Sequence, residues 1–366
     1  MSASKGGFSK AMIVVLGALA ITLILKMIFA NYPEWVEHFY YHGIYRSFRN
    51  VWDFIFSKSP IPIFYLWLFF LLIVFILIVR KFFFIKNQKV QSLKILFVLL
   101  ALHFIWFYWT WGFNYSRISL GQRWEINASV NEDLFLNEFY HQTTIVDSIR
   151  KQFKSEIESY SYNSIELENQ IRKLVIDFQK ENGFLAFEHV RCRNLSLEGI
   201  LLIWSTSGVY MPFAGEGQLD GGLHKLSKPF TMAHELCHGM GWTHEGDCNF
   251  MAYLICIKSP DPFIRYSGEL NYWRYLYANA SRVNPEEFKQ VRSILSKDIL
   301  NDLKEINEAN DRFPEIFPTL RTWFYDWYLK NNGIASGDKS YSEIIRMVIN
   351  FKEFAKGIPS GKEGRN

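Results

Sequence analysis

Two histidines with a glutamate beside the first form the strongest chemical signal in the sequence. They read His234-Glu235-Leu-Cys-His238, inside the segment Thr231–Tyr253. On a helix, residues four apart lie on one face, so both imidazoles can bind one metal ion. Zinc suits two imidazoles, one further protein ligand and an open position for water. Glu235 could then act as general base toward a metal-activated water. The pattern therefore predicts one Zn²⁺ per chain and hydrolysis of peptide bonds.

The residues after the histidines offer more than one third ligand. His244 completes the spacing H-E-x-x-H-x-x-G-x-x-H. Glu245 would begin a second helix, on which Asn249 lies one turn later on the same face and could support the ligands. Asp247 is a weaker candidate. The residues alone leave the choice open between Glu245 and His244.

The segment 207–218 could supply the substrate-binding edge of the site. In zinc peptidases of this type, an edge strand above the metal helix pairs with an extended peptide. The residues that would form this rim are Tyr210, Pro212, Phe213 and Glu216. An ordinary core strand and turn explains the same residues equally well. Stabilising the transition state needs a hydrogen-bond donor opposite the metal. The candidate donors are Tyr210, Arg265 and Tyr266.

The N-terminal part of the 366-residue chain predicts a membrane region at residues 1–111. Its apolar runs at about 11–30, 61–79 and 95–111 are each long enough to cross the hydrocarbon layer as a helix. The residues between the first two runs are rich in aromatics, and we expect them to lie at the outer interface. The lipid bilayer is therefore an expected partner.

Charge supports this division and orients the chain. Residues 1–111 hold 11 Lys and Arg against 3 Asp and Glu, and these basic residues flank the apolar runs. That is a membrane pattern, and the net charge of +4 gives no reason to expect a nucleic-acid partner. Basic residues concentrate before the first run and between the second and third runs. Both segments are therefore expected in the cytoplasm, with residues 112–366 outside.

Residues 112–366 predict a mostly helical α+β domain with a small sheet. Apolar periodicity or helix-start signals favour helices at 164–180, 285–310, 314–330 and 341–356. Strands are expected at 184–190 and within 200–211. The four cysteines, at 192, 237, 248 and 256, all fall in this part. Disulfides and four buried thiols are both compatible with it.

The chain resembles the DUF3810 family of bacterial membrane proteins. The matching segments are Gly208–Glu216, His234–Gly241, Glu245, Cys248–Cys256 and Asn332–Val348. The resemblance covers nearly the whole chain. It implies a set of N-terminal membrane helices followed by an outer zincin-like metallopeptidase domain of unknown substrate. Together with the charge distribution, this predicts the bacterial cytoplasmic membrane as the location, with the N-terminus inside and the domain periplasmic or extracellular. The resemblance also implies an acidic third ligand, which favours Glu245 over His244. Cys237 departs from the alanine usual at its position.

Two other functions compete with the membrane-anchored zinc peptidase. An intramembrane protease is disfavoured, because the stretch around His234 and His238 carries too many charged residues for a lipid-facing helix. A non-enzymatic membrane sensor or assembly factor, with a structural or vestigial metal, remains the alternative. Glu235 argues against it, because a purely structural site has no use for a general base.

Overall fold

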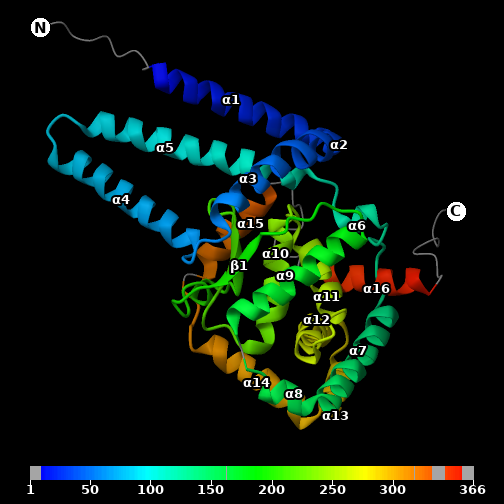
Figure 1. Cartoon of the computed structure of the whole chain (residues 1–366). Helices are drawn as coiled ribbons and strands as arrows, with labels where there is room; N and C mark the ends of the chain where they lie inside the picture. The colour runs from blue at the N-terminus through cyan, green and yellow to red at the C-terminus, as the bar shows by residue number, and fades with distance from the viewer. Residues whose placement is uncertain (1–9, 162, 317, 332–342, 357–366) are drawn as a thin grey trace, which may run out of the picture. The chain divides into compact units, whose positions relative to one another are not determined.

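The computed structural model describes residues 10–161, 163–316, 318–331 and 343–356 (Figure 1). The chain forms two compact units. The first comprises residues 1–117 together with the short segment Met211–Gly215, and the second comprises the residues from Ile118 onward without that segment. The described part is mostly helical, with one small three-stranded sheet.

The first unit contains the three apolar helices that the sequence predicts. They are α1 (Lys10–Asn31), α4 (Ile63–Phe84) and α5 (Lys89–Thr110), and each is long and apolar enough to cross a membrane. Within this unit α5 packs against both α1 and α4. Large apolar side chains such as Phe69 and Leu100 stay more than half exposed, as expected for helices whose solvent is lipid.

The residues between the first two spans are helical, where the sequence predicted only an aromatic-rich connection. They form α2 (Pro33–Trp35), the π-helix η1 (Val36–Tyr45) and α3 (Arg46–Phe56). Tyr40, Tyr41 and Tyr45 are fully buried there. The Tyr40 hydroxyl donates to the backbone carbonyls of Tyr108 and Trp109 at the end of α5. The hydroxyl of the buried Tyr40 therefore ties this connection to the last turn of the third span.

The second unit is built from helices around the sheet. The short elements at its start are α6 (Leu120–Arg123) and α8 (Lys154–Ser159). The longer helices are α7 (Glu132–Gln152), α9 (Ser164–Glu181), α10 (Lys228–Gly239), α11 (Glu245–Ile257), α12 (Pro262–Val283), α13 (Pro285–Ile294), α14 (Lys297–Asp311), α15 (Pro318–Asn331) and α16 (Glu343–Ala355). Among them, α10, α11 and α12 pack on one another and form the centre of the unit.

The sheet has the order β1-β3-β2. Its strands are β1 (Arg191–Asn194), β2 (Gly208–Met211) and β3 (Glu216–Leu219). β1 is parallel to β3, with Arg191 opposite Glu216. The connection between β2 and β3 is only residues 212–215, which is too short for a parallel crossover, so these two strands are antiparallel. Because β2 is the last strand in the order β1-β3-β2, it is an edge strand of the sheet. Helix α10 packs on the central strand β3.

Several predicted elements need correction. The single helix expected at 285–310 is two helices, because Ser296 accepts the backbone N–H of Ile299 and caps a new helix, α14. Residues 184–190 are not a strand, and the strand begins only at Arg191. Within 200–211, a 3₁₀ turn (Leu202–Trp204) precedes β2. The helices expected at 314–330 and 341–356 are present as α15 and α16. The first residues of the latter prediction lie outside the described part.

Candidate metal centre

Helix α10 carries both histidines on one face. Pro229 stands in its first turn, where the missing N–H has no helical partner to lose. The helix ends at Gly239, and Gly241 follows with a φ of +88°, a left-handed conformation that favours glycine. This turn lets the chain reverse and start α11 at Glu245 beside the histidines. Two helices that are adjacent in sequence thus present three side chains to one point.

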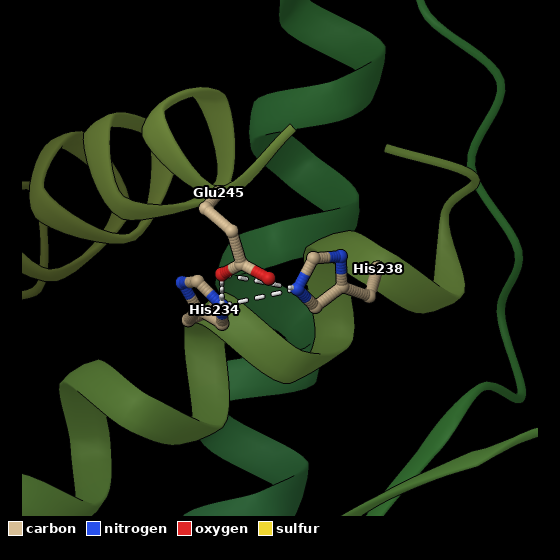
Figure 2. A group of neighbouring side chains, drawn as sticks. All are labelled: His234, His238 and Glu245. Atoms are coloured by element: carbon tan, nitrogen blue, oxygen red, sulfur yellow. Dashed lines mark hydrogen bonds and ion pairs between the residues drawn. The ribbon is translucent and has the colours of Figure 1, made fainter. Parts of the chain in front are cut away.

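The three side chains converge closely (Figure 2). His234 Nε2 lies 3.0 Å from His238 Nε2, and Glu245 Oε2 lies 3.2 Å and 3.8 Å from these two nitrogens. Ligands about 2.0–2.1 Å from a tetrahedral zinc would lie about 3.3 Å from one another. The spacing and the donor set of two imidazoles and one carboxylate therefore fit a zinc ion.

The hydrogen bond at Nδ1 of His238 also suits a metal ligand. Its Nδ1–H donates to the carbonyl oxygen of Trp242 at 2.8 Å, and the thiol of Cys248 lies 3.4 Å from the same nitrogen. A neutral imidazole carries one proton, so this hydrogen bond leaves the Nε2 lone pair directed at the common point. A partner of this kind on the second nitrogen is the usual support of a metal-binding histidine.

The two histidines hold the Glu245 carboxylate in its ionised form. Burial raises the pKa of Glu245, but hydrogen bonds and charge from His234 and His238 outweigh burial and keep that pKa well below its usual range. Conversely, burial lowers the pKa of His238, yet Glu245 raises it to about 9. Glu245 is thus a counter-charge for His238, and a bound metal cation would compete with the proton on that imidazole.

Glu235 lies on the strand side of α10, within reach of β2. The backbone N–H of Tyr210 donates to its carboxylate, and burial raises the pKa of Glu235 to about 7 against the lowering effect of the two histidines. Its Oε2 is buried and has no hydrogen-bond partner among the described residues. A Cβ added to Gly208 would lie 2.8 Å from Oε1, so the glycine lets the strand approach this carboxylate. One oxygen is therefore left to take up a proton.

Other residues predicted for the site lie on or directly before α11, but none of them joins the three converging ligands. Asn249 is buried on α11 and accepts a hydrogen bond from Tyr275 of α12 at 3.3 Å. His244 is the residue that precedes α11 and lies outside the group of three converging ligands found among the described residues. The Asp247 carboxylate instead accepts the backbone N–H groups of Leu120 and Gly121. Asp247 thereby ties the start of α6 to α11.

Three further candidates have structural partners. Glu216 is buried in β3 and pairs with Arg193 at 2.9 Å. Tyr266 is fully buried, and its hydroxyl donates to Asp302 at 2.6 Å. Arg265 lies over the ring of Phe153. These contacts account for the orientation of each side chain without a role in the metal centre.

Some residues near the ligands gave no signal in the sequence. Trp242 acts through its carbonyl, a group that every residue carries, so its identity predicts nothing. Tyr275 is brought to Asn249 by the packing of α12 on α11. The cysteines are buried free thiols in the structure, and burial raises the pKa values of Cys237 and Cys248.

The described part of the chain is thus mostly helical, with three candidate membrane spans and a His-His-Glu cluster at the junction of two helices, in which the histidines are buried and the glutamate is half-buried. The chain belongs to DUF3810, a family described as proteins of unknown function, whose model matches residues 40–349. Neither the comparison with curated proteins nor that with solved structures found a match.

Proposed function

We propose that the protein is a membrane-anchored zinc metallopeptidase with a zincin-like domain on the outer side of a bacterial cytoplasmic membrane. The observation that carries the proposal is the convergence of His234, His238 and Glu245 within 4.8 Å, next to the carboxylate of Glu235. The ligand set would be these three residues. A bound zinc would supply a Lewis acid that polarises the scissile carbonyl and makes a water acidic.

The chain's own groups suit the rest of the reaction. Glu235 is fixed through Tyr210, and its second oxygen is available to accept the proton of the attacking water and to pass it to the leaving amine. The edge strand β2 has an outer side on which an extended peptide could pair. Peptide pairing would then put the scissile bond beside Glu235, because Tyr210 lies in that same strand.

A structural metal site is the second candidate, as in a sensor or assembly factor. Closed structural zinc sites use four protein ligands, usually with several cysteines. Among the described residues, the converging group has three ligands and no cysteine. A set of three ligands without cysteine favours the hydrolytic function.

The test is Glu235→Gln in the full-length protein purified in detergent. We expect peptide hydrolysis to fall by at least about 10³-fold, because the amide cannot accept the proton, while bound zinc stays at the level of the unchanged protein. Activity would be followed with a fluorogenic peptide library. Full activity in the Glu235→Gln protein, or a complete loss of its zinc, would remove the general-base assignment.

A further inference from the structure

The short segment Met211–Gly215 connects the two strands nearest to Glu235, yet it packs within the first unit. Three consecutive residues of this segment are held there. The ring of Phe213 stacks on Trp67 of α4, with 5.1 Å between ring centroids and an interplanar angle of 9°. The carbonyl of Ala214 accepts the indole N–H of Trp52 at 3.0 Å. The carbonyl of Gly215 accepts Nη1 of Arg49 at 2.7 Å.

Both hydrogen-bond donors lie on one face of α3, because Arg49 and Trp52 are three residues apart. Arg49 is only 1% exposed, and its guanidinium also pairs with the carboxylate of Asp53. A buried charge of this kind is tolerated only when its donors are satisfied. Arg49 is therefore a fixed donor, and the Gly215 carbonyl is bound to a side chain that has little freedom to move.

The backbone of the segment is shaped to these contacts. Gly215 has a φ of +64°, a conformation that side chains other than glycine adopt rarely. A Cβ at this position would meet the indole of Trp52 and, at 3.0 Å, Nη1 of Arg49. The glycine thus permits both the turn and the close approach of the two side chains.

On either side of the segment, the chain enters the surroundings of Glu235. Tyr210 directly precedes Met211, and its N–H donates to the Glu235 carboxylate. Gly217 lies two residues after Gly215, and a Cβ there would be 2.8 Å from Cβ of Glu235. The two strands that bracket the general base are joined only through the residues that α3 holds.

We propose that Arg49 and Trp52 are positioning residues for the substrate-binding edge strand β2. They act through the peptide backbone: two carbonyls held by α3 limit the motion of the β2–β3 connection, and this keeps the edge strand in the extended conformation with which a peptide could pair. The kinetic part of this inference rests on the proposed function, whereas the effect on the mobility of the β2–β3 backbone does not.

The experiment compares Trp52→Phe with Trp109→Phe in the full-length protein in detergent. Both indoles are half-buried in the first unit and donate one hydrogen bond of 3.0 Å, but Trp109 donates to Thr22 instead of the segment. Hydrogen exchange of backbone amides is measured for a peptide covering residues 207–219. We expect Trp52→Phe to speed exchange there by about fivefold, the factor that corresponds to one lost hydrogen bond, and Trp109→Phe to leave it unchanged.

The second measurement is steady-state hydrolysis of an extended peptide. Trp52→Phe should raise KM by about fivefold with kcat and bound zinc little changed, because the edge strand binds substrate while Glu235 and the ligands remain in place. Gly215→Ala should have the same effects or larger ones. Equal exchange in the Trp52→Phe and Trp109→Phe proteins would overturn the inference. If the unchanged protein hydrolyses nothing, the proposed function fails, and the exchange comparison still decides the role of α3.

Discussion

At the residue scale, the centre depends on the groups that orient the ligands and set their charge. His238 donates its Nδ1 proton to the Trp242 carbonyl, and Glu245 stays ionised between the two imidazoles. The histidine pair could be predicted from sequence, because its spacing of four residues depends only on helix geometry. The Trp242 carbonyl could not be predicted, because the turn after Gly239 decides where it points.

The role of Asp247 gives a prediction at this scale. Its carboxylate accepts two backbone N–H groups at the start of α6, at 2.7 Å and 3.3 Å. Asp247→Asn replaces one acceptor oxygen by a donor, which would face those N–H groups. We expect a loss of about 1–3 kcal/mol in the free energy of unfolding, with about one zinc still bound per chain. Denaturant titration and metal analysis check this result, and loss of zinc from a folded Asp247→Asn protein would contradict it.

At the scale of elements, the sequence predicted best what local signals decide. The three apolar runs lie within α1, α4 and α5 apart from a few terminal residues, because hydropathy is a property of each segment by itself. The break between α13 and α14 was missed, since the Ser296 cap competes with a continuous apolar pattern. Residues 184–190 were predicted as a strand from alternation alone, but a strand also needs a partner, and β3 pairs with Arg191–Asn194.

A buried ion pair joins three helices of the second unit. Arg150 of α7 pairs with Asp302 of α14 at 2.8 Å, and the hydroxyl of Tyr266 of α12 donates to the same carboxylate. Hydrogen bonding and the charge of Asp302 raise the pKa of Arg150 although burial lowers it, so the guanidinium stays charged. This network explains why Tyr266, a candidate for the catalytic donor, is directed toward Asp302.

Removing Asp302 should destabilise the protein strongly. Asp302→Ala leaves the Tyr266 hydroxyl buried without its acceptor and leaves Arg150 only the exposed Glu158, and we expect the free energy of unfolding to fall by about 3–5 kcal/mol. The matched control is Asp177→Ala, which breaks the exposed pair Lys173–Asp177 within α9 and should scarcely change stability. Thermal and denaturant unfolding provide the measurement. Similar changes in the free energy of unfolding for the two substitutions would mean that the buried network contributes little to stability.

At the scale of the whole molecule, three candidate spans and the distribution of basic residues predict the topology. If the three spans found among the described residues all cross, the residues before the first span and those after the third lie on opposite sides of the membrane. Lys86 lies in the connection between α4 and α5, and Lys81 and Lys89 lie on either side of it, which favours the cytoplasm for that connection and for the N-terminus. This orientation predicts that the second unit lies outside the cytoplasm.

Reporter fusions test this topology. An exported phosphatase, which folds only outside the cytoplasm, should be inactive when fused after Asn87 and active when fused after Asn366. A reporter that fluoresces only in the cytoplasm should give the opposite pattern at the same two positions. Phosphatase activity at Asn87 would contradict the predicted orientation and would place the metal centre on the cytoplasmic side.

The central claim is that His234, His238 and Glu245 bind one zinc ion. The most direct measurement is zinc per chain, by mass spectrometry of the purified full-length protein after reconstitution, for the unchanged protein and for His238→Ala, Glu245→Ala and His244→Ala. We predict about one zinc in the unchanged and His244→Ala proteins and a loss of zinc in the other two. A folded unchanged protein without zinc, or zinc lost with His244→Ala but retained with Glu245→Ala, would contradict the account.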